Sequence, residues 1–184
     1  MKRVTDVVLS LMALTLLAPV FVLAALAVVL GSGPPVLFRQ TRVGLGGREF
    51  GMLKFRSMVK DAALTGPYYT RTNDVRITRV GQFIRRTSID ELPQIINVLR
   101  ADMSLVGPRP DVPAQRSLYS DADWTQRCSV RPGITGLAQA KIRSEGTGEE
   151  RLALDLQYTR QVSAWFDLKI MWWTLARLGG KGGN

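Results

Sequence analysis

Two adjacent carboxylates, Asp90 and Glu91, are the residues of this 184-residue chain best suited to chemistry on phosphorus. Ser88 precedes Glu91 by three positions, which fits a capping box, so a helix start explains both residues but gives Asp90 no role. An aspartate at a helix N-terminus lies in a positive field that keeps it ionised, and an ionised aspartate is a competent nucleophile. Arg85 and Arg86 precede the pair closely enough to hold phosphate oxygens. The pattern is therefore typical either of a helix start or of a phosphoryl-transfer site.

A second group of residues holds one arginine between two prolines. Pro108 and Pro110 restrict the backbone on both sides of Arg109, and Gly107 permits a close backbone approach. A rigid turn under the core would account for the prolines, whereas a guanidinium fixed in one place suits an anionic ligand. The same pattern recurs at Arg131, which is followed by a proline and two glycines.

The composition narrows the kinds of site that the chain can form. It contains no histidine and one cysteine, Cys128. Catalytic triads and dyads that need histidine are excluded, as are zinc sites with imidazole ligands and any intrachain disulfide. Chemistry is left to carboxylates, hydroxyls, lysine and arginine, or to a hard cation such as Mg²⁺.

Basic residues are concentrated in one stretch of the chain. The net charge is +10, and residues 39–86 carry eleven lysines and arginines against three acidic residues. Such a block predicts an anionic partner, which would be a phosphorylated ligand, an acidic lipid headgroup or a nucleic acid. The alternative is a solvated surface together with charges that flank a membrane segment.

An uncharged, mostly apolar run extends over the 24 residues from Val7 to Leu30. As a helix it would be about 36 Å long, enough for a hydrocarbon core of about 30 Å. Pro19 lies near its centre and predicts a break, because proline removes a helical hydrogen bond and clashes with the preceding turn. Basic residues flank both ends, so no charge asymmetry favours crossing. We expect a re-entrant helix hairpin, with a spanning helix as the alternative.

The remaining patterns predict an α-rich α+β fold. We expect a membrane anchor over residues 1–35 and one continuous interfacial catalytic domain over residues 36–184. Its small β-hairpin has strands at 36–43 and 48–55 around a glycine turn. The C-terminal helix carries Trp165, Trp172 and Trp173, which fit either a membrane interface or a packed core. Short helices are expected at 57–64, 78–86, 90–99, 113–126, 149–163 and 164–178, with loops and a possible short strand at 102–112 and 129–147.

These motifs together resemble those of the bacterial sugar transferases, also called small monotopic phosphoglycosyl transferases. The resemblance covers nearly the whole chain, including the basic N-terminus and the proline-broken apolar run. It rests on Lys54-Phe-Arg-Ser-Met58, Thr87-Ser-Ile-Asp-Glu-Leu-Pro-Gln94, Asp102-Met-Ser-Leu-Val-Gly-Pro-Arg-Pro110, Arg131-Pro-Gly-Ile-Thr-Gly136 and Asp167-Leu-Lys-Ile170.

The resemblance implies transfer of a sugar-1-phosphate from a UDP-sugar to polyprenol phosphate, with release of UMP, by a ping-pong mechanism. In that scheme Asp90 is the nucleophile and a ligand of Mg²⁺, and Glu91 assists as a general base. Phosphate oxygens would be held by Arg85, Arg109, Arg131 and Lys54, while Gly107, Pro108 and Pro110 shape the site and Pro19 breaks the membrane helix.

The same resemblance implies a location and partners. We expect a monotopic protein on the cytoplasmic face of the bacterial inner membrane, acting in the first membrane step of glycoconjugate or exopolysaccharide synthesis. Anionic headgroups of the bilayer would be partners, as would a second copy of the chain or downstream glycosyltransferases, and nucleic acid would not. The chain departs from common family residues at Ala18, Leu137 and 144–149, and the last segment bears on donor identity.

Two other functions compete with this interpretation. A membrane-tethered protein could use the basic block to bind nucleic acid or anionic lipid, with steep salt dependence, but the arginine–proline loops would then have no explanation. A catalytically inactive scaffold is the third possibility, and the intact Asp90, Glu91 and Arg109 argue against it.

Overall fold

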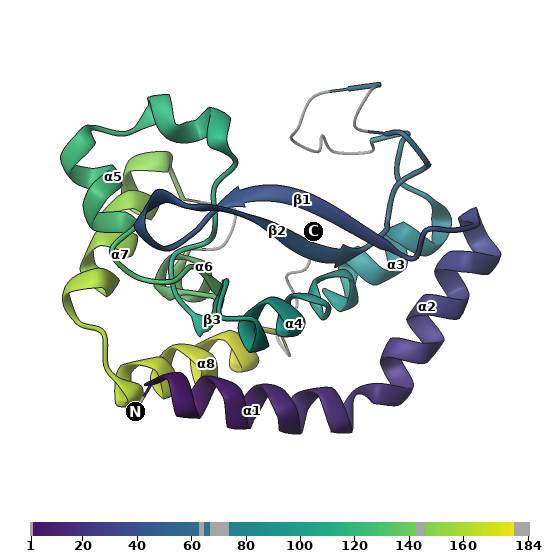
Figure 1. The fold of residues 1–184 in the computed structure, drawn as a ribbon, viewed down its shortest axis with the longest axis horizontal. Coiled ribbons are helices and arrows are strands. Elements are labelled where there is room, and N and C mark those ends of the chain that lie inside the picture. Colours follow the sequence, from purple (N-terminus) through teal and green to yellow (C-terminus); the bar gives the residue numbers. More distant parts are fainter. Residues whose placement is uncertain (1, 63–64, 67–73, 143–145, 179–184) are drawn as a thin grey trace.

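A computed structural model describes residues 2–62, 65–66, 74–142 and 146–178 of the chain. This part is helix-rich and contains two small two-stranded sheets, as expected for an α-rich α+β fold (Figure 1). In chain order the elements are α1 (Lys2–Leu16), α2 (Ala18–Ser32), β1 (Leu37–Val43), the 3-10 turn η1 (Leu45–Gly47), β2 (Glu49–Phe55), α3 (Arg79–Arg86), η2 (Ile89–Glu91), α4 (Gln94–Leu99), β3 (Ser104–Val106), η3 (Pro113–Leu118), α5 (Asp121–Arg127), β4 (Gly133–Thr135), α6 (Leu137–Lys141), α7 (Gly148–Arg160) and α8 (Ala164–Leu178).

The apolar N-terminal run forms two helices, α1 and α2, that are bent by 63° relative to each other. The break falls at Leu17, and Pro19 lies in the first turn of α2, where its missing N–H costs least. The predicted break at Pro19 is therefore confirmed. No single described helix has the length and apolar character needed to cross a membrane, although α1 and α2 taken together do.

The predicted β-hairpin is confirmed. β1 and β2 are antiparallel, with Leu37 opposite Phe55 and Val43 opposite Glu49. The turn between them needs glycine, because Gly46 and Gly47 have φ of 64° and 78°. The turn lies near α5 and the open end of the hairpin lies beside α2 and α3 (Figure 1).

One side chain of α4 completes the outer edge of β2. The carboxamide of Asn97 accepts a hydrogen bond from the Leu53 N–H and donates one to the Gly51 carbonyl, both at 2.9 Å. Asn97 is fully buried, and Met52 on the same strand packs with Val98 of α4. This edge contact fixes α4, and with it the η2 turn that precedes it, against the hairpin.

The second sheet is a parallel pair, in which β3 and β4 place Ser104 opposite Gly133 and Val106 opposite Thr135. Both strands fall in stretches expected to be loops with a possible short strand. The prediction of loop over 129–147 misses α6, however, whose Leu137 and Ala140 belong to the core shared with α7 and α8. Tertiary burial stabilises this five-residue helix, which is too short to form on local propensity alone.

The predicted helix over 57–64 is wrong for the residues that the structure describes, and 63–64 lie outside them. Met58 forms an isolated antiparallel bridge with Ile77, and the Arg56 side chain donates to the Ser32 carbonyl at the end of α2. These contacts hold the segment in an extended form. The helices predicted at 90–99 and 113–126 are each divided into a 3-10 turn and an α-helix, η2 with α4 and η3 with α5.

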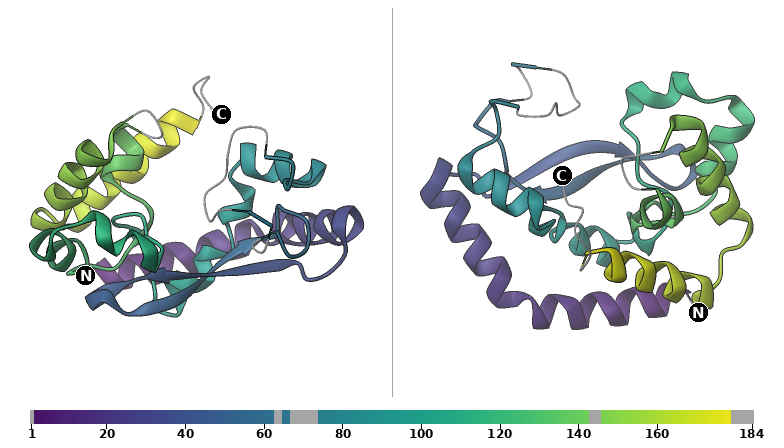
Figure 2. Two further views of the ribbon diagram at one scale, coloured as in Figure 1. Left: turned by 90° about the horizontal axis from the view of Figure 1, so that it is seen from above. Right: turned by 180° about the vertical axis from the view of Figure 1, so that it is seen from behind.

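The tryptophans of helix α8 lie on two different faces, and the predicted core packing is confirmed for Trp173 alone. Ile170 is fully buried and Trp173 packs against the core around it. Trp165 and Trp172, by contrast, are 73% and 69% exposed. The exposed tryptophans and Leu168 lie three or four positions apart, so they share one helix face. Figure 2 shows α8 at one side of the molecule, where its first turn is joined to the N-terminal end of α1 by the ion pair of Asp167 with Lys2.

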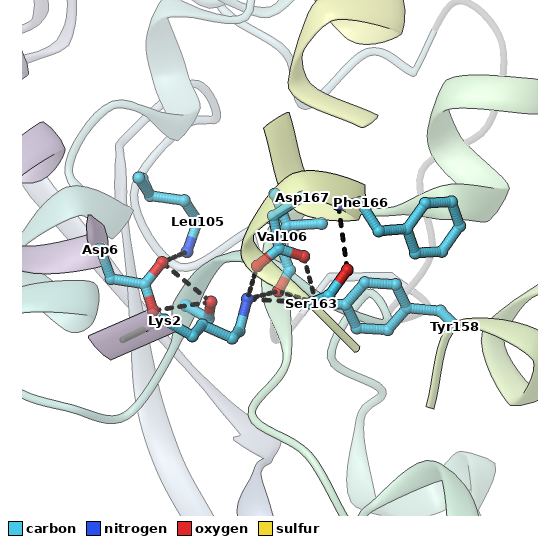
Figure 3. Close-up of polar contacts among 9 residues, drawn as sticks. Lys2, Asp6, Leu105, Val106, Tyr158, Ser163, Phe166 and Asp167 are labelled. Atoms are coloured by element: carbon cyan, nitrogen blue, oxygen red, sulfur yellow. Dashed lines mark hydrogen bonds and ion pairs between the residues drawn. The ribbon is translucent and has the colours of Figure 1, made fainter. Parts of the chain in front are cut away.

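The N-terminal helix is tied to the rest of the chain by two buried polar contacts (Figure 3). The Lys2 ammonium group forms an ion pair with Asp167 of α8 and donates to the Val106 carbonyl at 3.0 Å and the Tyr158 hydroxyl at 3.1 Å. One turn further on, Asp6 accepts hydrogen bonds from the Ser104 hydroxyl and, at 3.1 Å, from the Leu105 N–H. Both contacts therefore fix α1 to β3.

Gly107 provides a test of the packing around the parallel pair. A Cβ at this position would lie 2.3 Å from the Arg131 carbonyl oxygen and 2.8 Å from the Gly133 nitrogen, both backbone atoms. We expect Gly107→Ala to lower the free energy of unfolding by about 3 kcal/mol, as for an overpacked core. Denaturant unfolding in detergent measures this change. The matched control is Gly148→Ala at the start of α7, where no atom of the described residues lies within 4 Å of the added Cβ, and equal stabilities of the two variants would contradict the prediction.

Candidate active site

Asp90 and Glu91 lie in η2, a single 3-10 turn, and not in the first turn of an α-helix. The predicted capping box is wrong. Ser88 adopts a left-handed conformation (φ 57°) and its side chain caps no N–H, whereas a capping residue needs extended backbone. Helix α4 begins only at Gln94. The turn thus presents two carboxylates between two helices, and the positive field of a helix N-terminus does not explain their ionisation.

Glu91 is held by two cations. Its Oε1 forms ion pairs of 2.7 Å with Lys54 Nζ and of 2.7 Å with Arg109 Nη2. Burial alone would raise the pKa of Glu91, but the attraction of Arg109 and Lys54 outweighs it and holds that pKa well below its usual range. Lys54 and Glu91 are largely buried, whereas about half of the Arg109 side chain is exposed. Glu91 therefore stays ionised and fixes the two cations beside its neighbour.

Asp90 is in the opposite situation. It is 7% exposed, and within the described part of the chain its carboxylate forms no hydrogen bond or ion pair. Burial raises its pKa above the ordinary value, while the positive charges of Lys54, Arg85 and Arg109 oppose this. The result is a carboxylate without a protein partner in a positive surrounding, which is the state required of a nucleophile or a metal ligand.

The loop after β3 places Arg109 by fixing its backbone. Carbonyl groups along this loop accept hydrogen bonds from five different parts of the chain. These are Val106 O from Lys2 and Tyr158, Pro108 O from Gly133 N, Arg109 O from Arg127, Pro110 O from Arg42 and Asp111 O from Val43 N. The backbone on both sides of Arg109 is therefore fixed, and its guanidinium extends from this frame to Glu91.

The structure unites most of the predicted site residues but not all of them. Lys54, Arg85 and Arg109 all act on Asp90. Arg131 does not join them, because its Nε donates to the Ala101 carbonyl at 2.9 Å and no described contact links it to either carboxylate. Its guanidinium is used to hold the chain that leads into β3, so this part of the predicted site is not assembled. Residues 143–145 of the segment linked to donor identity lie outside the described residues.

Comparison with known proteins agrees with the resemblance that the sequence motifs indicate. The family model of the bacterial sugar transferases matches residues 1–180. The chain belongs to the bacterial sugar transferase family. It is 47% identical over 186 residues to a UDP-glucose:undecaprenyl-phosphate glucose-1-phosphate transferase of Caulobacter vibrioides. The matched region covers 96% of this chain and 69% of that protein. The resemblance inferred from the motifs is confirmed.

Other relatives of this sugar transferase are longer and differ in the sugar that their names specify. The Escherichia coli protein of the same name is 45% identical over 95% of the chain, which spans 39% of that protein. A UDP-N-acetylgalactosamine-undecaprenyl-phosphate N-acetylgalactosaminephosphotransferase of Aeromonas hydrophila is 38% identical, and the chain spans 42% of it. The chain thus spans less than half of these two relatives.

The residues present fit one divalent cation at Asp90. Magnesium is usually bound by one or two carboxylates, with phosphate and water oxygens completing its shell. Asp90 offers a carboxylate that no described side chain occupies, whereas Glu91 is committed to Lys54 and Arg109. Among the described residues no cluster of three or more acidic or thiol side chains could hold a metal, so an ion at Asp90 would use substrate and water oxygens as further ligands.

Two arginines of the site were not singled out from the sequence. Arg42 donates to the Pro110 carbonyl at 2.9 Å, and burial followed by the charge of Arg109 lowers its pKa to about 10. Arg42 lies in β1 on the same face of the hairpin as Lys54. Because side chains two residues apart on a strand share a face, the alternation of the two strands could have identified Arg42 from the sequence. Arg127 had no such signal, because nothing local distinguishes it from an exposed arginine at a helix end.

Arg127 is the buried support of the Arg109 loop. It is 7% exposed, and its guanidinium pairs with Asp111 and Asp155 and donates to the Arg109 carbonyl at 2.6 Å. A buried guanidinium needs this full set of partners, since removing one leaves an uncompensated charge. The transferase therefore holds one surface arginine in place through a second one underneath it.

Asp155 makes this support dependent on pH. Burial raises its pKa to about 6, although Arg127 opposes this, and one of its oxygens has no hydrogen-bond partner. Between pH 4 and pH 6 the folded chain keeps a proton that the unfolded chain has released, so the contribution of Asp155 to the free energy of unfolding falls as pH rises. The decrease amounts to at most about 3 kcal/mol. Urea unfolding of wild type and Asp155→Asn from pH 4 to pH 7 should show the free energy of unfolding of wild type falling relative to that of the variant by up to that amount, and a constant difference would contradict this.

Proposed function

We propose that this sugar transferase moves a sugar-1-phosphate from a UDP-sugar to polyprenyl phosphate and releases UMP. The observation that carries the proposal is the buried Asp90 carboxylate, which has no hydrogen-bond or ion-pair partner among the described residues and lies beside the cations Lys54, Arg85 and Arg109. The relatives are named as transferases that use UDP-glucose or UDP-N-acetylgalactosamine with undecaprenyl phosphate, which supports the same substrate classes here. Their names differ in the sugar, so the donor is proposed as a UDP-sugar.

The first half-reaction is a displacement at the β-phosphorus of the donor. An Asp90 oxygen forms a bond to this phosphorus, and the bond to the bridging oxygen breaks, so that UMP leaves with the electron pair. Arg85, Arg109 and Lys54 bind the phosphate oxygens and balance their charge during the displacement. A Mg²⁺ ion held by Asp90 would supply further charge neutralisation on the diphosphate.

The second half-reaction returns Asp90 to its starting state. An oxygen of polyprenyl phosphate attacks the same phosphorus, the acyl-phosphate bond breaks, and Asp90 leaves as a carboxylate. Glu91 is a poor proton acceptor while both cations hold it. It can act as the predicted general base only after Lys54 and Arg109 turn to substrate phosphates, and until then it positions those cations.

We propose that α1 and α2 form a re-entrant anchor that leaves the transferase monotopic on the cytoplasmic face of the bacterial inner membrane. The bend at Pro19 and the exposed apolar side chains on both helices support this, since neither helix alone has the length of a span. The exposed tryptophan face of α8 suits the headgroup region of the same leaflet. These features would place the site where a soluble donor and a lipid acceptor meet.

Loss of the nucleophile tests the proposed function directly. Asp90→Asn should form no phosphosugar adduct with a UDP-sugar and Mg²⁺ and should release UMP at least about 100-fold more slowly than wild type. Intact-protein mass spectrometry and UMP release measure the two effects, with Asp121→Asn, an exposed residue of α5, as control. Normal UMP release by Asp90→Asn would refute the assignment.

The environment of Asp90 predicts the pH dependence of adduct formation. Because only ionised Asp90 attacks, the rate falls as pH decreases through its pKa, which burial has raised. Lys54→Met removes the largest attraction that opposes burial, so the acidic limb should move to higher pH. Lys54→Arg keeps the charge and should leave the limb near its wild-type position. Single-turnover rates at saturating donor measure both, and an unmoved limb in Lys54→Met would contradict the assignment.

A further inference from the structure

An apolar groove lies beside the catalytic turn. Its walls are Phe21, Val22 and Ala25 of α2, Phe55 at the end of β2, and Pro93 and Ile96 at α4, together with the start of β1. Its volume is about 360 Å³, which is within the range of small-ligand sites. Every lining side chain is apolar, so a ligand inside the groove would be a hydrocarbon.

The groove and the charged cluster are formed by neighbouring residues of β2 and of the η2–α4 region. Successive residues of a strand face opposite sides, so Phe55 faces the groove while Lys54 reaches Glu91. Ile89 and Leu92, which flank the two carboxylates, pack against the apolar cluster that contains Phe55. The charged cluster and the apolar groove are therefore adjacent, separated by the end of β2 and the residues that flank the two carboxylates.

We propose that this groove binds the first isoprene units of the polyprenyl phosphate acceptor, an inference that rests on the proposed function. The phosphate would lie at Lys54 and Arg109, and the chain would pass the η2 turn into the groove. In polyprenyl phosphate the hydrocarbon begins directly at the phosphate. A diacyl phospholipid instead places glycerol and ester oxygens there, and the groove offers them no polar side chain.

Filling the groove should affect only the second half-reaction. Ala25 is partly buried in the wall, and Ala25→Phe adds a ring inside it. We expect the KM for polyprenyl phosphate to rise about tenfold or more, as for loss of an apolar pocket, while adduct formation from UDP-sugar alone stays within about twofold of wild type. The matched control is Leu23→Phe on the same helix, whose side chain is 67% exposed and lies outside the groove.

A second variant guards against misfolding of the first. Val22 lies at the rim and is 59% exposed, so Val22→Phe narrows the groove without disturbing a buried site. It should raise the same KM in the same direction. If wild type transfers sugar phosphate and both variants keep the wild-type KM, the groove proposal is wrong and the proposed function stands. If wild type forms no adduct and no product, both are wrong.

Photolabelling locates the chain directly. The probe is a polyprenyl phosphate with a diazirine on the isoprene unit next to the phosphate, incubated with the whole transferase in vesicles. The label should appear on peptides that contain Val22 or Ile96, and unlabelled polyprenyl phosphate should compete whereas excess phosphatidic acid should not. Label confined to other peptides, or equal competition by phosphatidic acid, would overturn the proposal in favour of a general lipid contact.

Discussion

The backbone carbonyls at the end of β3 and in the loop after it are where five elements of the molecule meet. Lys2 of α1 and Tyr158 of α7 both donate to the Val106 carbonyl, and Arg127 of α5 donates to that of Arg109. A buried carbonyl without a donor costs roughly 1–3 kcal/mol, so each donor is constrained in position by the loop as much as the loop is by the donor. Helix α1 and Arg109 therefore share one rigid frame, and a displacement of α1 would be transmitted to Arg109.

Within that frame, charge is distributed so that one carboxylate is neutralised and the other is not. Glu91 takes both nearby cations on a single oxygen, and Asp90 keeps the residual positive field without a direct bond. Two carboxylates with equal partners would have similar pKa values and no division of labour. Different surroundings separate the pKa values of Glu91 and Asp90. A chain without histidine can thus hold a carboxylate that positions cations beside a second carboxylate that is left for reaction.

The features that could be predicted from the sequence are those with a local cause. Pro19 breaks its helix wherever it is placed in one, and Gly46 and Gly47 define the hairpin turn through their positive φ. Ser88 failed as a cap because the end of α3 sets its left-handed conformation. Arg131 was singled out by the proline and glycines that follow it, whereas Arg127 was not, yet Arg127 supports the Arg109 loop and Arg131 binds the Ala101 carbonyl. Their difference is set by contacts between distant segments, which local patterns do not contain.

The carboxamide of Asn97 has a consequence for solubility and assembly. It occupies the outer edge of β2 with the donor and acceptor pattern of one more strand residue. An uncovered edge is a template for strands of other molecules, and crowding on a membrane surface raises the chance of such encounters. A single amide thus works as a terminator of strand addition, which protects the hairpin from edge-to-edge aggregation at the cost of one buried side chain.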